Sequence, residues 1–295
     1  MRNYIYFGKE KWFLETSFPG VRRAKKDAFR IDKEIFKGKS KFQDVYIFES
    51  PGFGKTLVLD GIIQLSQSDE FIYHETIAHT PLLSHKSPKR LLVIGGGDGG
   101  ALREATKHPL KEIYFVEIDR KIVEVAKKYL PFISSGAFNA RRVKIFFEDG
   151  IKFIKRYKDF FDVVIVDSTD PVGPGKVLFE AGFYRLVFDS LKKDGIAVFQ
   201  LGPFLDFDLI IRPTARKLQK LFKFVRSIRL PMPSYSCGCE YCFMIASKYI
   251  DPAAINPAKI KERLKARLGQ KAAKLKYYSA AMHRASMVMP RIWQV

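Results

Sequence analysis

Five carboxylate residues follow four apolar stretches of this chain, each near the point where a stretch ends. They are Asp98, Glu117, Asp149, Asp167 and Asp170. If the stretches are parallel strands of one sheet, their carboxyl ends share the edge at which open α/β sheets bind ligands. A single acid at such a position is often only a helix cap, and Asp119 is expected to be one. The five acids are instead expected to converge on one crevice that attracts a cation.

A glycine-rich turn stands between the first of these stretches and a predicted helix over residues 101–107. Residues 90–103 read RLLVIGGGDGGALR, so an apolar strand is followed at once by Gly95, Gly96 and Gly97. Strand, glycine turn and helix are typical of a nucleotide-binding βα unit, because the glycines let the backbone approach a ligand and the helix N-terminus offers free N–H groups.

The spacing of two further acids favours an adenosine-type ligand. Glu117 lies about 20 residues after the glycines, the position of the acid that holds ribose hydroxyls in nucleotide-binding folds. Asp149 and Gly150, at the end of the third strand, are placed to contact the adenine. A dinucleotide is less favoured, because the second half of the chain has no second glycine fingerprint.

S-adenosyl sulfonium compounds are one kind of adenosine-type ligand. Asp98 favours those whose tail ends in an amine over those whose tail carries a carboxylate. A methyltransferase accepts the carboxylate of its donor's amino-acid tail near the glycine turn, where Asp98 would repel it. An amine tail without a carboxylate would be attracted, and two unit charges about 4 Å apart interact by about 4 kcal/mol at an effective dielectric constant of about 20. Asp167 and Asp170, three residues apart before Pro171, add negative charge. These residues indicate a pocket for a polyamine.

The elements that must position these residues form two predicted domains. Residues 1–75 are expected to be a small antiparallel β domain, with a first strand from Trp12, an alternating run over 29–36 and a hairpin that turns at 60–61. Residues 76–295 alternate strands and helices, which predicts a doubly wound, mostly parallel, Rossmann-like catalytic domain of the methyltransferase type with right-handed crossovers. Further helices are predicted over residues 70–83, 120–130, 151–157, 180–191, 212–222 and 259–276.

The composition is that of an ordinary globular protein with a strongly basic surface. The 295 residues are 47% hydrophobic and carry a net charge of +21. Lys and Arg are scattered along the chain, which favours the Lys-rich surface of a heat-adapted protein over a nucleic-acid site. No apolar run approaches the roughly 20 residues of a membrane span, and the N-terminus has no signal-peptide core. We therefore expect a cytoplasmic protein that binds neither membrane nor nucleic acid.

The three cysteines, Cys237, Cys239 and Cys242, lie in one short segment, CGCEYC. They could begin a metal site, but no fourth ligand is apparent nearby. A redox-sensitive loop or plain packing is therefore favoured over zinc, and we expect no metal.

Five segments together resemble the polyamine aminopropyltransferase family, to which the spermidine synthases belong. They are LVLDGIIQLSQSDEFIYHE (57–75), IGGGDGGALRE (94–104), VEID (116–119), VDSTDPVGPGKVLFE (166–180) and LKYYSAAMHRASMVMP (275–290). The match covers nearly the whole chain, and GGGDGG together with DSTDPVGP is a specific pairing. The resemblance implies transfer of the aminopropyl group of decarboxylated S-adenosylmethionine to an amine, with release of methylthioadenosine and without a further cofactor.

The resemblance also implies roles for the site residues. The methylthioadenosine part would be held by Gln43, Glu117, Asp149, Gly150 and Pro174, beside the glycine loop. The aminopropyl tail and the acceptor would be bound by Gln64, Tyr73, His74, Asp98, Asp167, Ser168, Thr169, Asp170 and Tyr235. Asp167 would accept the proton of the attacking amine. Members of the family associate through the N-terminal β module, so a homodimer or homotetramer is expected.

One departure from the family pattern concerns the acceptor. Where the family often has a YPSG-type loop, residues 235–242 read YSCGCEYC, with one apparent inserted residue. DSTDPVGP is closest to the spermidine-forming pattern, so putrescine is the first acceptor expected. Agmatine, cadaverine and a longer polyamine stay open.

The chemistry sets a condition on Asp167. A primary amine has a pKa near 10.4, so its neutral form costs about 4–5 kcal/mol at pH 7. Asp167 can act as a strong base only if its own pKa is raised.

Other interpretations of the same residues remain open. His74 could be a satisfied buried histidine, Tyr73 and Tyr235 core aromatics, and Gln43 and Gln64 ordinary strand residues. The rival classes are a methyltransferase acting on RNA or a small molecule, and a protein that only binds its ligand.

Overall fold

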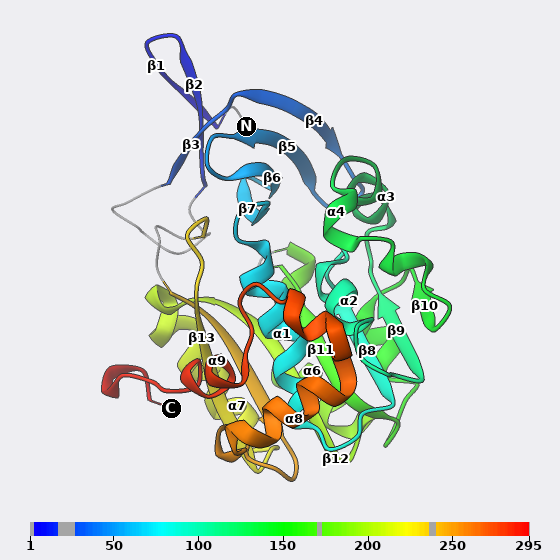
Figure 1. The fold of residues 1–295 in the computed structure, drawn as a ribbon. Coiled ribbons are helices and arrows are strands. Elements are labelled where there is room, and N and C mark those ends of the chain that lie inside the picture. Colours follow the sequence, from blue (N-terminus) through cyan, green and yellow to red (C-terminus); the bar gives the residue numbers. More distant parts are fainter. Residues whose placement is uncertain (1–2, 17–26, 170–172, 236–239, 295) are drawn as a thin grey trace.

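The computed structural model describes residues 3–16, 27–169, 173–235 and 240–294 of the chain (Figure 1). The strands are β1 (Tyr4–Phe7), β2 (Glu10–Leu14), β3 (Ala28–Arg30), β4 (Lys33–Lys39), β5 (Asp44–Ser50), β6 (Gly54–Leu59), β7 (Ile62–Ser66), β8 (Arg90–Gly95), β9 (Glu112–Val116), β10 (Val143–Phe146), β11 (Phe161–Asp167), β12 (Leu191–Pro203), β13 (Phe224–Pro231) and β14 (Glu240–Ser247). The α-helices are α1 (Glu70–Ser84), α2 (Gly100–Ala105), α3 (Arg120–Tyr129), α4 (Pro131–Ser134), α5 (Gly150–Ile154), α6 (Ala181–Ser190), α7 (Arg212–Gln219), α8 (Pro257–Leu268) and α9 (Ala280–Ala285). Short 3₁₀ or π segments are η1 (Ala137–Asn139), η2 (Gly173–Phe179), η3 (Phe204–Asp206), η4 (Phe207–Ile211), η6 (Pro252–Ala254), η7 (Gly269–Lys274) and η8 (Arg291–Trp293).

The N-terminal strands form two small antiparallel sheets, β1-β2-β3 and β4-β5-β6-β7. The predicted hairpin is confirmed: Leu59 pairs with Ile62, and Asp60 and Gly61 both have positive φ angles, 49° and 84°. Such angles suit the tight turn between two twisted strands. Two predictions for this region were wrong. The first strand is β1, which precedes Trp12, and the run over residues 29–36 is divided between β3 and β4, which belong to different sheets.

The main sheet has seven strands in the order β10-β9-β8-β11-β12-β14-β13. The first five are parallel, and β14 runs antiparallel to both of its neighbours. This confirms the doubly wound, mostly parallel fold with a small antiparallel region before it. The strand order changes direction between β8 and β11, which is where such sheets open a crevice for a ligand.

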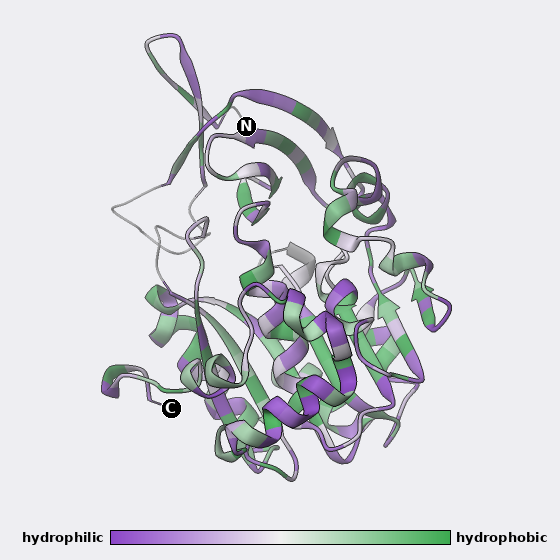
Figure 2. Cartoon of the chain, in the orientation of Figure 1, coloured by the Kyte–Doolittle hydropathy of each residue, from purple (hydrophilic) through white to green (hydrophobic). Residues whose placement is uncertain are grey.

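The central strands are apolar on both faces, as expected for a parallel sheet covered by helices. Val93 and Ile165 pack into the hydrophobic core on one face, which includes Leu82 of α1. Leu92 and Val164 pack into the core on the other face. Figure 2 shows hydrophobic residues concentrated on the central strands and hydrophilic residues along β4 and the connecting loops. Every helix within the described residues is too short or too polar to cross a lipid bilayer.

Helix α1 connects the N-terminal strands to the main sheet. It confirms the predicted helix over residues 70–83 and runs without a break across residue 75, where the sequence places the domain boundary. Thirteen of its residues are buried, so its surroundings rather than an amphipathic pattern fix its position. The division at residue 75 stays a prediction.

The C-terminal segment is tied to α1 through hydrogen bonds to both charged and backbone groups. The predicted helix over residues 259–276 ends early, because Gly269 (φ 56°) stops α8 before η7. The guanidinium groups of Arg263 and Arg267 donate to backbone carbonyls at the end of α1 and just beyond it. These carbonyls have no intrahelical partner, so the two arginines act as a cap.

Glu75 anchors the same segment from the side of α1. Its buried carboxylate accepts the backbone N–H groups of Lys276, Tyr277 and Tyr278, at 2.9, 2.9 and 2.7 Å.

Glu75→Ala would leave three donors without an acceptor, each at a cost of about 1–3 kcal/mol. We expect the free energy of unfolding, measured by chemical denaturation, to fall by at least about 3 kcal/mol. Glu124→Ala on the exposed face of α3 is the control and should change it by less than about 0.5 kcal/mol. Equal effects of the two substitutions would contradict this account.

Candidate active site

One pocket lies where β8, β9 and β11 end, and the loops and strands of the β4–β7 sheet cover it. It brings together Gln43, Gln64, Tyr73, His74, Gly95, Gly96, Gly97, Asp98, Glu117, Asp149, Gly150, Asp167, Ser168, Thr169 and Tyr235, all named from the sequence. Asp170 lies outside the described residues. Pro174 belongs to η2, but its side chain is outside the described part of the chain. Four of the five strand-end acids therefore share one pocket.

Asp167 ends β11 with its carboxylate against the glycine turn. A Cβ at Gly96 would lie 2.7 Å from Oδ2 of Asp167, so the close approach requires glycine, as does the φ of +70°. The hydroxyl of Tyr73 donates to Oδ1 at 2.6 Å. Oδ2 of Asp167 and the hydroxyl of Ser168 have no hydrogen-bond partner among the described residues, which leaves both for a ligand.

Burial raises the pKa of Asp167 to about 6. The nearby charge of Asp98 raises it further, whereas the charge of His74 and the hydrogen bond from Tyr73 oppose the shift. The condition that the sequence set on this residue is therefore met in direction: near neutral pH Asp167 is ionised, yet it binds a proton more readily than an exposed aspartate.

His74 and Asp98 form an ion pair beside Asp167. Nε2 of His74 lies 3.2 Å from Oδ1 of Asp98, and Nδ1 lies 2.6 Å from Oε2 of Glu70. Burial alone would lower the pKa of His74, but the two carboxylates outweigh it and raise that pKa to about 10. Asp98 also accepts the N–H of Gly100 at 2.7 Å, and its pKa is lowered despite burial because of His74. His74 thus stands behind Asp98 with both ring nitrogens engaged.

At the edge of the pocket near β9 and β10, the carboxylates accept hydrogen bonds from backbone N–H groups. Burial raises the pKa of Glu117 to about 7, although the backbone N–H of Asp119 donates to its Oε1 at 2.9 Å. Asp119 caps α3 as predicted by accepting the N–H of Lys121. Nε2 of Gln43 donates to Oδ2 of Asp119 at 3.1 Å, which joins the N-terminal sheet to this edge. Asp149 likewise caps α5 from the pocket wall.

An aromatic wall closes the side of the pocket near β12 and β14. Tyr73, Tyr235, Tyr241 and Phe243 have ring centroids 4.7–6.1 Å apart, and the hydroxyl of Tyr235 donates to the backbone carbonyl of Gln64. Tyr73 and Tyr235 are therefore both packed aromatics and lining residues. Their hydroxyls stay protonated, because burial raises both pKa values well above the usual range.

The sequence did not identify several lining residues. They are Glu15, Phe42, Leu57, Leu59, Ile62, Ile63, Ile94, Val116, Ile118, Ile122, Gly175, Val177, Leu178, Gln200 and Tyr241. One signal was available for Gln200, which is a polar residue in the apolar run of β12 near its carboxyl end. The apolar members come from strands and loops whose facing could be assigned only with the fold in hand.

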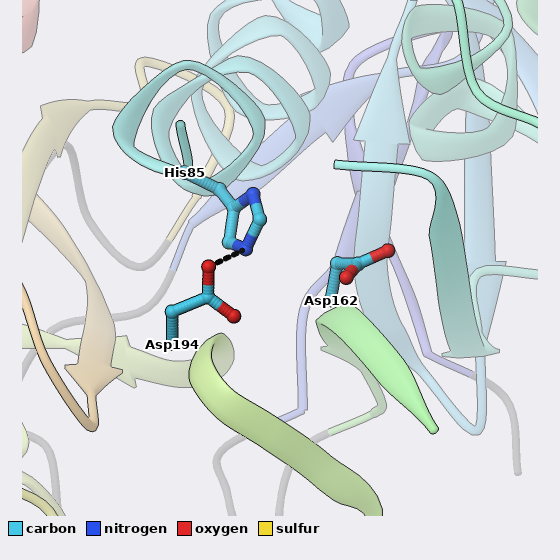
Figure 3. A group of neighbouring side chains, drawn as sticks. All are labelled: His85, Asp162 and Asp194. Atoms are coloured by element: carbon cyan, nitrogen blue, oxygen red, sulfur yellow. Dashed lines mark ion pairs between the residues drawn. The ribbon is translucent and has the colours of Figure 1, made fainter. Parts of the chain in front are cut away.

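Two groups elsewhere bear on metal binding. Cys237 and Cys239 lie outside the described residues, and Cys242 is buried on β14, where burial strongly raises the pKa of its thiol and so disfavours the thiolate. His85, Asp162 and Asp194 lie close together at the opposite end of the sheet (Figure 3).

The contacts of His85, Asp162 and Asp194 fit an ion-pair network better than a metal centre. Asp162 accepts the backbone N–H groups of Lys89 and Arg90 and lies 2.7 Å from the ammonium of Lys192. Nδ1 of His85 accepts the N–H of Ser87, and burial lowers the pKa of His85. The neutral ring then carries its proton on Nε2, the atom that faces Asp194, so no lone pair points into the group.

The fold and the pocket define the class of protein: a methyltransferase-like α/β protein with a glycine-rich turn beside an acidic, partly aromatic pocket. Residues 70–256 match the family model of the spermine/spermidine synthase domain, and residues 11–67 match that of the spermidine synthase tetramerisation domain. The chain belongs to the spermine/spermidine synthase family, the polyamine aminopropyltransferases, and is a transferase.

Individual relatives match over nearly the whole chain. A polyamine aminopropyltransferase of Caldicellulosiruptor saccharolyticus is 43% identical over 287 residues, 97% of each chain. One from Methanocaldococcus jannaschii is 42% identical and covers 92% of this chain and 90% of its own. A spermidine synthase in complex with the transition-state analogue AdoDATO superposes with a TM-score of 0.87 at 34% identity, covering 95% of this chain and 92% of that one. Spermidine synthase from Thermotoga maritima gives a TM-score of 0.83 at 33% identity, with the same coverage.

Gly100 tests whether the position of the His74 ring matters. A Cβ at residue 100 would lie 2.2 Å from Cε1 of His74, so Gly100→Ala must displace the imidazole. We expect aminopropyltransferase turnover to fall at least tenfold. The control is Gly182→Ala in α6, where a Cβ meets nothing within 4 Å; it should leave turnover unchanged and raise stability by up to about 1 kcal/mol. Normal turnover in Gly100→Ala would show that the ring position is unimportant.

Proposed function

We propose that this enzyme transfers the aminopropyl group of decarboxylated S-adenosylmethionine to putrescine, giving spermidine and methylthioadenosine. The observation that carries the proposal is the pair of carboxylates beside the glycine turn, the buried Asp167 and the half-buried Asp98. A donor that ends in an amine is attracted there, whereas the carboxylate of S-adenosylmethionine would be repelled. The names of the curated relatives support the same reaction class.

The reaction is a displacement at the carbon next to the sulfonium. The lone pair of the amine forms the new C–N bond, the C–S bond breaks, and its electron pair neutralises the sulfur. The amine nitrogen then loses one proton, for which Oδ2 of Asp167 is the acceptor in this proposal. Tyr73 donates to Oδ1 at 2.6 Å, and Oδ2, which has no partner among the described residues, would face the amine. A carboxyl group with a pKa near 6 remains a weak base beside an amine, so orientation and proximity supply much of the rate.

The proposed donor position follows the polar edge of the pocket. Glu117 would accept the ribose hydroxyls, and these hydrogen bonds would offset the burial of its carboxylate. Gln43, Asp149, Gly150 and Pro174 would surround the rest of the methylthioadenosine part. The aminopropyl tail would reach Asp98, with His74 acting on it through Asp98. No metal and no cofactor beyond the donor enters this proposal.

The acceptor would lie between Asp167 and the aromatic wall. Gln64, Ser168, Thr169 and Tyr235 complete its surroundings in the proposal, together with Asp170. Putrescine is preferred because of the DSTDPVGP segment. Agmatine, cadaverine and longer polyamines remain alternative acceptors, since residues 236–239 of the acceptor-side loop lie outside the described chain.

The proposed enzyme associates with further copies of itself. The match of residues 11–67 to a tetramerisation domain supports self-association, as a homodimer or a homotetramer. The cytoplasmic location expected from the sequence stays a prediction.

Steady-state turnover with a matched pair of donors tests the reaction. Decarboxylated S-adenosylmethionine and S-adenosylmethionine are each combined with putrescine, agmatine, cadaverine and spermidine, and methylthioadenosine release is measured. We expect release with the decarboxylated donor only, and fastest with putrescine. A different best amine would replace putrescine as the acceptor. Methyl transfer from S-adenosylmethionine would instead establish the rival methyltransferase class and overturn the proposal.

Asp167 gives the reaction a defined pH dependence. Because its carboxyl must be ionised to accept a proton, kcat is expected to fall as the pH drops through about 6.

Asp167→Asn removes the acceptor oxygen while keeping the size of the side chain, so turnover should fall by at least about 100-fold. Binding of methylthioadenosine, measured by calorimetry, should persist in this variant and serves as the control for folding. Near-normal turnover of Asp167→Asn would refute the assignment.

A further inference from the structure

A line of charges of alternating sign runs from the surface of α2 to the pocket. Its members are Lys107, Glu104, Arg103, Glu70, His74 and Asp98. Each makes an ion pair with the next, and the carboxylates of Glu70 and Glu104 are almost entirely buried. Only Asp98 and His74 line the pocket; Glu70 and Arg103 do not reach it. Glu70 therefore acts on the pocket through His74, which it contacts directly, whereas the charge of Arg103 also lowers the pKa of Asp98.

The geometry determines the charge of the His74 ring. One nitrogen faces Glu70 at 2.6 Å and the other faces Asp98 at 3.2 Å. A neutral imidazole has a single N–H, so one of its lone pairs would point at a carboxylate. Both contacts are favourable only when both nitrogens carry protons. Asp167 at the end of β11 and Arg103 on α2 are the other charged groups near this pair.

Glu70 is itself rigidly held. Its two oxygens accept from Nη1 and Nη2 of Arg103 at 3.1 and 2.9 Å, a bidentate contact. Arg103 also donates to Glu104 and to the backbone carbonyl of Ile133. The carboxylate that faces His74 is therefore fixed by Arg103 of helix α2, which does not line the pocket.

We propose that Glu70, held by Arg103, is a positioning residue that keeps the His74 ring doubly protonated, so that Asp98 meets the polyamine pocket as half of an ion pair. The inference rests on the proposed function and adds residues that act on the amine from a distance. Two carboxylates without a compensating cation would hold the amine as ammonium, which cannot attack. The imidazolium offsets one of the two charges, so the pocket binds a cation and still releases its proton.

The direct test is the titration of His74 in the whole protein. ¹⁵N-histidine labelling reports the two ring nitrogens of each of the five histidines, and His74→Asn assigns the pair of interest. In the wild type we expect His74 to stay protonated up to pH 9. In Glu70→Gln its titration midpoint should fall by about 1–3 pH units, the effect of removing one adjacent opposite charge. Glu112→Gln is the matched control, because Glu112 also meets two cations but lies at the opposite end of the sheet. An unchanged His74 midpoint in Glu70→Gln would refute the proposal.

The kinetic test separates this role from a merely structural one. As His74 loses its proton in Glu70→Gln, the amine should be held as ammonium, so kcat at pH 9 should fall about tenfold relative to the wild type. At pH 6.5 kcat should be nearly normal, and KM for the acceptor should not rise. Glu70→Asp should restore part of the activity at pH 9. A loss of kcat that is the same at both pH values would contradict the proposal.

A second variant covers the case in which Glu70→Gln does not fold. Arg103→Lys keeps a cation at Glu70 but removes the bidentate contact, so a smaller fall of the His74 midpoint is expected in the same spectra. No change in the spectra of this folded variant would overturn the role of Arg103. The titration does not depend on turnover; if the wild type failed to transfer an aminopropyl group, the proposed function would fail while the titration result would stand.

Discussion

Two carboxylates, Asp98 and Asp167, share one buried pocket, and their mutual repulsion is the constraint that the surrounding groups must satisfy. The two carboxylates differ in their hydrogen-bond partners and in their pKa values. Asp98 is paired with the imidazolium of His74 and with the N–H of Gly100, so its pKa is lowered. Asp167 is buried beside the charge of Asp98, and the hydrogen bond from Tyr73 does not offset these two effects, so its pKa is raised to about 6. Two nearby acids that contact neighbouring residues of one helix, Tyr73 and His74, thus have opposite pKa shifts.

Helix α1 positions both Tyr73 and His74. Contacts from several distant segments of the chain hold this helix in place. The three backbone N–H groups of the C-terminal segment bind Glu75, two arginines of α8 cap the end of the helix, and Arg103 of α2 fixes Glu70 at its start. Asp69, just before the helix, accepts the backbone N–H and the hydroxyl of Ser234, next to the aromatic wall. These contacts fix α1 at its start, in its middle and at its end, and thereby the positions of Tyr73 and His74 beside the pocket.

The local parts of this arrangement could be predicted from the sequence, and the long-range parts could not. The hairpin at Asp60 and Gly61, the helix from Glu70 and the cap at Asp119 each depend on a few neighbouring residues, and all were confirmed. The convergence of the strand-end acids followed from the topology of a parallel sheet. The pairing of Glu70 with Arg103 joins residues 33 apart through the packing of α1 on α2, and no local pattern signals it. Tyr241 was missed for a similar reason, because it reaches the pocket from a strand that carries no motif, and Gln200 had only one local signal, its polarity within the apolar run of β12. β1 was missed because its four residues are a short, partly exposed strand.

The basic exterior and the acidic pocket are compatible because they act over different distances. At physiological ionic strength, exposed charges are screened beyond about 8 Å, so the net charge of +21 barely reaches a ligand inside the pocket. Many surface carboxylates are also already paired with Lys or Arg, as in Glu148 with Arg156 and Glu262 with Lys259. Inside the pocket the balance is set by a few groups: Glu15, Asp98, Glu117, Asp149 and Asp167 all line it, and His74 is the one cation among the described lining residues. A polyanion would meet that residual negative charge at close range, without screening. The net charge of the whole chain is therefore a poor guide to its ligand, and the local excess of carboxylates over cations is the physical reason to favour a cationic amine.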